Sequence, residues 1–79
     1  MNEYKKGVIE MIKELKSISE VDESLGLIDS GFLDSFDIIT LIDKMEEDFA
    51  IKIPGAEIIP ENLNSYNDIA SLIKRIKDE

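Results

Sequence analysis

Hydrophobic and polar residues follow a helical spacing in three separate stretches of this chain. In the first stretch, residues 2–18, apolar side chains recur every three or four positions. These positions are Tyr4, Val8, Met11, Leu15 and Ile18. Lysines and glutamates fill much of the remaining surface, and Gly7 weakens the helix only slightly. The pattern predicts a helix over about residues 2–18 that packs through its apolar face.

The clearest amphipathic pattern lies in residues 35–49. At about 100° per residue, one face of the predicted helix is apolar and holds Ile38, Leu41, Ile42, Met45 and Phe49. The outward positions are Phe36, Thr40, Asp43 and Glu47, flanked by Ile39 and Glu46 on one side and Asp37 on the other. We expect the apolar face to pack in the core. An aromatic side chain on the outward face is not needed for folding, and it indicates contact with another molecule.

A third helix is predicted over residues 65–77. Ser65 followed by Asp68 is typical of a helix N-terminus, because a serine cap and an acidic first turn both stabilise it. The buried stripe of this helix is Ile69, Leu72, Ile73 and Ile76. Before it, Pro54 disfavours helical geometry, and Pro60 limits a short turn or helix over about residues 56–63.

Residues 19–34 lack a helical period and are predicted to form a long loop between the first two main helices. Long loops in small domains are usually functional or are anchored by their own apolar residues. The apolar residues of this loop are Val21, Leu25, Leu27, Ile28, Phe32 and Leu33. We therefore expect the loop to lie against the helices. The chain, residues 1–79, is predicted to be a single all-α domain of three main helices and one short helix.

The composition excludes several classes of chemistry. A chain of 79 residues makes one small domain with a thin core. It has no cysteine and no histidine, so disulfides, thiolate metal sites and a Ser-His-Asp triad are all excluded. We expect no catalytic residues, no metal-ligand set and no enzymatic activity of the chain itself.

The charge points to proteins as partners. The formal net charge is −9, from 18 acidic and 9 basic residues, which argues against nucleic acid or an anionic membrane and for basic protein surfaces. No apolar run approaches the roughly 18–20 residues of a membrane-spanning helix, and no signal peptide is visible. The expectation is a cytoplasmic protein. It should be monomeric, because no second apolar stripe is left to pair with another copy.

The most informative local sequence is the hexapeptide Gly31–Phe36, in which Asp34 and Ser35 stand where the loop becomes a helix. A helix start presents unpaired N–H groups and the positive end of the helix dipole, so it favours a negative group attached there. Two interpretations are open. Ser35 is either only a helix cap, a role that Asp34 could also fill, or the attachment point of a phosphate-linked prosthetic group.

The residues around this hexapeptide resemble the acyl carrier protein family. The stretch Leu27–Phe49 is similar to the family's Asp-Ser-Leu motif and the recognition helix that follows it, and the similarity extends to residues 51–54 and 65–76. The resemblance implies an acyl-carrier-like four-helix bundle with 4′-phosphopantetheine esterified to Ser35. It also implies that a phosphopantetheinyl transferase installs this arm from coenzyme A in a magnesium-dependent step, with Asp34 helping to hold the magnesium.

In this family the arm's terminal thiol carries an acyl or aminoacyl group as a thioester between enzymes. The resemblance therefore implies three kinds of partner: the transferase, an acyl- or amino acid-activating ligase, and an acyl-using synthase or transferase. The cargo stays open between a fatty acyl chain, a polyketide-type or other secondary-metabolite intermediate, and an amino acid such as D-alanine. The alternative interpretation is an acidic helical adaptor that binds one target protein and in which Ser35 is only a cap.

This sequence departs from the usual family pattern at two outward positions. Phe36 stands where leucine is usual after the serine, and Thr40 stands where fatty-acid carriers commonly have a carboxylate. The stretch 60–65 is more similar to discrete carriers outside primary fatty-acid synthesis, including the D-alanyl carriers. These features favour a specialised discrete carrier.

The helix after Ser35 is expected to dock the partner enzymes. The docking residues expected from the sequence are Phe36, Asp37, Ile39, Asp43, Glu46 and Glu47. Carboxylates on this face would speed encounter with basic partner surfaces, and the apolar residues would form the centre of the contact. Two simpler interpretations are also open, namely partial core burial of Ile39 and a purely dipole-related role for Asp34.

Overall fold

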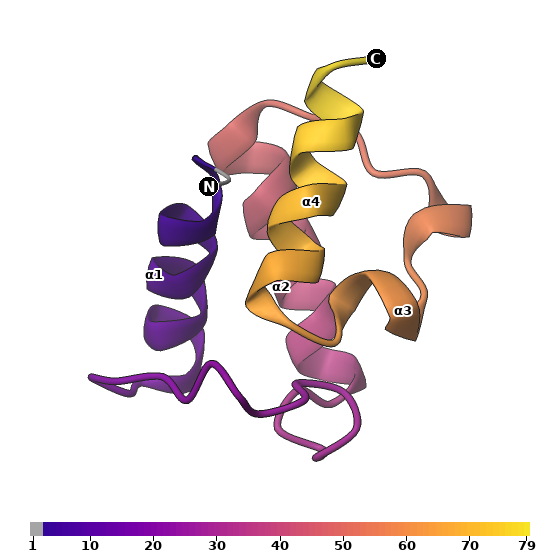
Figure 1. Ribbon diagram of the computed structural model, residues 1–79. Helices are drawn as coiled ribbons and strands as arrows, with labels where there is room; N and C mark the ends of the chain where they lie inside the picture. Colours follow the sequence, from indigo (N-terminus) through magenta and orange to yellow (C-terminus); the bar gives the residue numbers. More distant parts are fainter. Residues whose placement is uncertain (1–2) are drawn as a thin grey trace.

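Helices and the loops between them make up the structure, a computed structural model that describes residues 3–79 (Figure 1). The elements are α1 (Lys5–Lys16), α2 (Ser35–Phe49), a 3₁₀ turn η1 (Gly55–Glu57), α3 (Pro60–Leu63) and α4 (Tyr66–Lys77). Within these residues there is no β-strand. The predicted all-α helical bundle is confirmed.

The helix α1 is shorter than the predicted range of residues 2–18. Its N-cap residue, Tyr4, makes no side-chain cap hydrogen bond, and Ser17 ends the helix by adopting a left-handed backbone conformation with φ 55°. A left-handed residue usually terminates a helix, but glycine is the residue that normally signals it in a sequence. The expected end at residue 18 is therefore wrong by two residues. The expected start at Asn2 lies outside the described residues.

The helix α2 has the predicted bounds. It begins after a capping residue, Asp34, and ends where Ala50 takes a left-handed conformation with φ 54°. Leu41, Ile42 and Met45 are buried. Ile38 and Phe49, at the two ends of the same face, pack against the core while keeping some exposure.

The predicted short element over residues 56–63 is two elements in the structure. η1 ends at Glu57, and α3 starts separately at Pro60. Pro60 begins a helix because its fixed φ and missing N–H suit the first helical position. In α4, the Ser65 hydroxyl accepts a hydrogen bond from the Asp68 N–H at 3.0 Å, which confirms the predicted N-cap.

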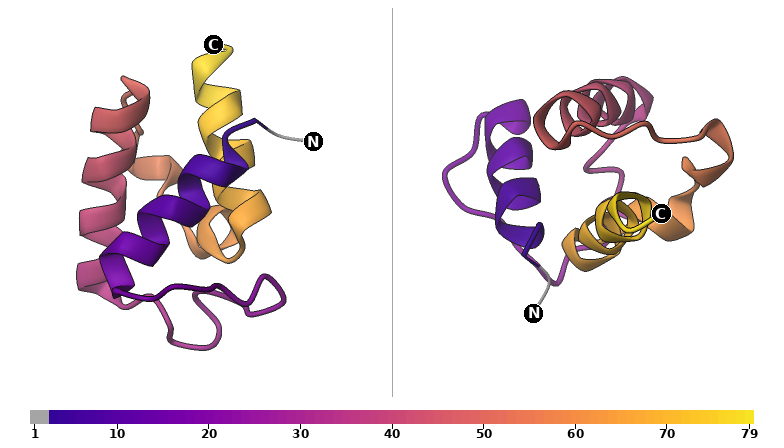
Figure 2. Two further views of the ribbon diagram at one scale, coloured as in Figure 1. Left: turned by 90° about the vertical axis from the view of Figure 1, so that its left-hand side faces the viewer. Right: turned by 90° about the horizontal axis from the view of Figure 1, so that it is seen from above.

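The three long helices surround one apolar core, and α1 packs against both α2 and α4 (Figure 2). Every buried side chain among the described residues is apolar or aromatic. The largest fully enclosed side chains are Val8, Ile12, Leu27, Leu41, Met45, Leu63, Ile69, Leu72 and Ile73. Leu27 belongs to the long loop, so the loop contributes to the core as predicted.

The long loop crosses the end of the bundle opposite the C-terminus and leads directly into α2 (Figure 1). Leu27 and Leu33 are both buried, and the Leu33 N–H donates to the Leu27 carbonyl at 3.0 Å. The loop is thereby closed onto itself just before Ser35. Over the described part of the chain, no helix is both long and apolar enough to cross a membrane.

Candidate functional site

Asp34 is the residue that caps α2. Its side chain accepts a hydrogen bond from the Asp37 N–H at 2.8 Å, and the Asp37 carboxylate accepts one from the Asp34 N–H at 3.2 Å. This reciprocal arrangement is a capping box, which satisfies two of the N–H groups at the helix start. Asp34 therefore fills the cap role that the sequence allowed for it, and its carboxylate lies at the positive end of the helix dipole.

Ser35 is the first residue of α2 and is exposed to solvent. Within residues 3–79 its hydroxyl makes no hydrogen bond, since Asp34 provides the cap. The interpretation of Ser35 as a cap is wrong for this reason. The Ser35 hydroxyl therefore lies exposed at the start of α2, and it does not take part in capping this helix.

A lysine from α1 connects this helix start to the rest of the bundle. The Lys16 Nζ lies 2.9 Å from Asp37 Oδ2 and 4.9 Å from the centre of the Phe32 ring. The hydrogen bond from Lys16 lowers the pKa of Asp37 below its ordinary value, against the opposing effect of burial. Lys16 therefore holds together α1, the end of the loop and the first turn of α2.

The residues present fit a phosphate-linked group on Ser35. By their position, the first-turn N–H groups of Ser35 and Phe36 have no intrahelical acceptor, and they lie at the positive end of the helix dipole. A phosphodiester on the Ser35 oxygen would lie beside these donors, which is a favourable place for an anion. The exposure of Ser35 leaves space for a long arm.

The outward side of α2 carries two exposed apolar side chains. Phe36 is 80% exposed and Ile39 is 62% exposed, so the alternative of partial core burial for Ile39 is wrong. Asp43 and Glu47 are exposed on the same helix. These four residues project into solvent as the sequence pattern predicts.

Two of the carboxylates expected on the docking face have partners inside the molecule. Asp37 bonds to Lys16 and caps α2, and its side chain is only 18% exposed. Glu46 accepts a hydrogen bond from the Ile53 N–H at 2.8 Å and so holds the segment that follows α2. Their structural roles were missed because the partners lie 21 and 7 residues away in the sequence.

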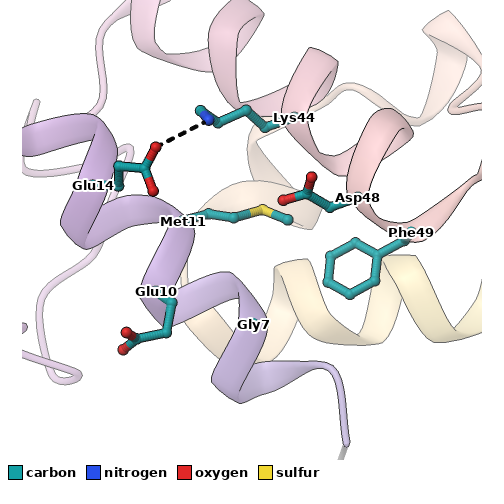
Figure 3. Close-up of a pocket in the computed structure, with 7 residues that line it drawn as sticks. All are labelled: Gly7, Glu10, Met11, Glu14, Lys44, Asp48 and Phe49. Atoms are coloured by element: carbon teal, nitrogen blue, oxygen red, sulfur yellow. Dashed lines mark hydrogen bonds and ion pairs between the residues drawn. The ribbon is translucent and has the colours of Figure 1, made fainter.

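A separate pocket of about 280 Å³ lies between α1 and the C-terminal half of α2 (Figure 3). Lys44 and Glu14 form an ion pair of 3.4 Å across it, and the Phe49 ring lies at one side. Asp48 and Phe49 stand at the opposite end of α2 from Ser35, roughly 20 Å away at the rise of a helix. The pocket is therefore not part of the site at Ser35.

Comparison with known proteins identifies the class of protein to which this fold and this helix start belong. The family model described as "Phosphopantetheine attachment site" matches residues 6–76, so the chain belongs to this family. It is accordingly a carrier protein with covalently attached 4′-phosphopantetheine, and not an enzyme.

Individual relatives are similar over almost their whole length. The D-alanyl carrier protein of Lactococcus lactis subsp. lactis (strain IL1403) is 34% identical over 77 residues, covering 95% of this chain and 98% of the relative. The D-alanyl carrier protein of Streptococcus sanguinis (strain SK36) is 33% identical over 79 residues, with 96% and 98% covered. That of Bacillus velezensis is 27% identical over 77 residues. No solved structure gives a significant match.

Proposed function

We propose that Ser35 carries the 4′-phosphopantetheine arm and that the cargo of this carrier is D-alanine. Attachment to Ser35 is supported by the different roles of Asp34 and Ser35 at the start of α2. Asp34 caps the helix, while the exposed Ser35 hydroxyl has no hydrogen bond within the described residues. An unengaged hydroxyl beside free first-turn N–H groups is suited to receive a phosphate.

Attachment is a phosphoryl-type transfer in which the Ser35 oxygen is the nucleophile. The hydroxyl releases its proton to the medium, and its oxygen forms a bond to the pantetheine-bearing phosphorus of coenzyme A. The pyrophosphate bond breaks, and adenosine 3′,5′-bisphosphate leaves with the bonding electrons. Asp34 has one carboxylate oxygen engaged by the Asp37 N–H, so the other oxygen is available to the magnesium ion of the transferase reaction.

The cargo is proposed from the curated relatives. Those described above are D-alanyl carrier proteins, and the alignments span 98% of two of them at 33–34% identity. The arm supplies a terminal thiol that holds the amino acid as a thioester. Its partners are a phosphopantetheinyl transferase, a ligase that activates D-alanine and a transferase that takes the D-alanyl group, and we place the monomeric carrier in the cytoplasm.

The outward side of α2 is the proposed docking face. Phe36 and Ile39 supply exposed apolar area, while Asp43 and Glu47 supply negative charge. Opposite charge on a partner would raise the rate of encounter, and the apolar pair would provide most of the contact energy. Asp37 and Glu46 act in this face indirectly, because Asp37 fixes the start of α2 and Glu46 holds the segment that follows α2.

The cargo is tested on the phosphopantetheinylated carrier with ATP and a D-alanine-activating ligase. We expect the intact mass to rise by one alanyl group with D-alanine and to fall back after treatment with neutral hydroxylamine, which cleaves thioesters. L-alanine, and a fatty acid with an acyl-activating ligase, are the comparisons. Efficient acylation by the fatty acid alone would overturn the D-alanine assignment while leaving the carrier function intact.

A further inference from the structure

Asn64, at the C-terminal end of α3, holds the loop that precedes Ser35. Its side-chain oxygen accepts hydrogen bonds from the Ile28 N–H at 2.8 Å and the Asp29 N–H at 3.0 Å. Its side-chain nitrogen donates to Asp29 Oδ2 at 3.0 Å. Its backbone carbonyl accepts from the Leu27 N–H at 2.7 Å. One residue thus makes four hydrogen bonds to three consecutive loop residues.

The restraint reaches Ser35 through a short closed segment. The Leu33 N–H returns to the Leu27 carbonyl, and the Gly31 N–H donates to the Ile28 carbonyl at 3.0 Å. Gly31 has φ +79°, a conformation that suits glycine and lets the segment turn back toward Leu33. Asp34 and Ser35 follow immediately. Fixing residues 27–29 therefore fixes the place from which the chain enters α2.

This set of side-chain contacts needs an acceptor and a donor on the same side chain, which an amide provides. Asparagine offers an acceptor oxygen and a donor nitrogen on one planar group, whereas a carboxylate offers acceptors alone. The fit is close, because a Cβ placed on Gly26 would lie 3.3 Å from the Asn64 oxygen. Asp29, Glu61 and Asp68 line, together with Asn64, a hollow of about 430 Å³. A negative charge at position 64 would be repelled most by Asp29, because Asp29 Oδ2 lies 3.0 Å from the Asn64 side-chain nitrogen.

We propose that Asn64 is a positioning residue for the attachment of phosphopantetheine to Ser35, an inference that rests on the function proposed above. Asn64 touches neither Ser35 nor the reacting atoms. It keeps the loop in the conformation in which Ser35 is presented to the transferase. Without this restraint, a smaller fraction of the molecules has the loop conformation that presents Ser35. The apparent affinity for the transferase falls in proportion to that fraction.

The test exchanges the amide and the carboxylate of the Asn64–Asp29 pair. In N64D the carboxylates of Asp29 and of the new side chain at position 64 face each other. In D29N/N64D the amide donor is at position 29 and the carboxylate acceptor is at position 64, so the hydrogen bond is restored in the opposite direction. We expect N64D to lower kcat/KM for transfer from coenzyme A by about tenfold, through a higher KM for the carrier with kcat nearly unchanged. D29N/N64D should return to within about threefold of the unaltered chain.

A neighbouring asparagine provides the matched control. Asn62 lies in α3, two residues before Asn64, and donates to the Glu57 carbonyl at 2.8 Å and to its carboxylate at 3.2 Å. N62D adds the same charge two residues away and breaks a comparable contact, but the partner of Asn62 is Glu57 and not the loop. We expect N62D to be modified at the normal rate. An equal slowing in N62D and N64D, or no recovery in D29N/N64D, would overturn the proposal.

Amide exchange tests the restraint without any substitution, so a poorly folded N64D does not prevent a decision. The Ile28 and Asp29 N–H groups should exchange slowly in the unaltered chain, because both are bonded to Asn64. Fast exchange there would overturn the proposal. A folded N64D with normal kinetics would do so as well. Failure of the proposed function is distinguishable, since the unaltered chain itself would then gain no mass.

Discussion

Asp34 and Ser35 are adjacent residues with different tasks at the start of α2. The side chain of Asp34 points to the N–H of Asp37, whereas the Ser35 hydroxyl is exposed and unbonded within the described residues. Sequence alone could not separate these tasks, because serine and aspartate are both favoured N-caps. What it did predict correctly is that an aspartate or a serine at this point begins the helix.

Substitutions of Asp34 separate its capping role from its proposed role in the attachment step. D34A should lower the free energy of unfolding by about 1 kcal/mol, because the helix loses its cap. D34N keeps an N-cap acceptor and should stay within about 0.5 kcal/mol of the unaltered chain. Urea unfolding gives both values. If Asp34 also contacts magnesium, the folded D34N should still be modified at least tenfold more slowly, and a normal rate would contradict that role.

The ion pair between Lys16 and Asp37 should affect how the free energy of unfolding changes at acid pH. Lys16 lowers the pKa of Asp37, so this carboxylate stabilises the fold above about pH 4, its ordinary pKa, and the contribution is lost as the pH falls through the lowered value. In K16M the decline between pH 4 and pH 2 should be smaller. K13M removes a half-buried lysine of the same helix, which pairs with the exposed carboxylate of Glu10 and not with Asp37, and should keep nearly the full decline. An unchanged profile in K16M would contradict the assignment.

At the level of elements, the sequence predicted α2 and α4 well, and α1, η1 and α3 less well. Both well-predicted helices combine a continuous apolar stripe with a side-chain cap, at Asp34 and at Ser65. The end of α1 was misplaced because Ser17 adopts a left-handed conformation without being glycine. The break between η1 and α3 was missed because Pro60 was interpreted as a limit rather than as a first helical residue.

The end of α2 offers a stability prediction. Ala50 is left-handed, with φ 54° and ψ 48°, where a Cβ is unfavourable and glycine is the preferred residue. A50G should therefore raise the free energy of unfolding by about 0.5–1 kcal/mol. Ser71→Gly, at an exposed position inside α4, should do the opposite by about 0.5 kcal/mol. Destabilisation by A50G in urea unfolding would contradict the left-handed end of α2.

At the level of the whole molecule, contacts distant in sequence complete the site. The Asn64 side chain bonds to loop residues 35 and 36 positions away, and Lys16 lies 21 residues from Asp37. No local sequence pattern around Asn64 or Lys16 indicates such contacts. The helical pattern therefore predicted the bundle and the position of Ser35, while the restraints on the loop before Ser35 required the three-dimensional structure.

The net charge of −9 also acts on the whole molecule. Repulsion among the carboxylates opposes compaction, and salt screens it. We expect the melting temperature to rise by about 4–8 °C between low salt and 0.5 M NaCl, which corresponds to about 1 kcal/mol for a domain of this size. Calorimetry at constant pH measures the change. A melting temperature that stays constant or falls with salt would show that attractive ion pairs outweigh the repulsion.

The central claim is that Ser35 receives the prosthetic group, and intact mass tests it most directly. The chain is incubated with coenzyme A, magnesium and a broad-specificity phosphopantetheinyl transferase, beside S35A and the control Ser71→Ala. We predict a gain of one phosphopantetheine in the unaltered chain and in Ser71→Ala, and no gain in S35A. The claim is contradicted by a gain in S35A. It is also contradicted if the unaltered chain gains nothing, even with a cognate transferase, while a known carrier in the same tube is modified.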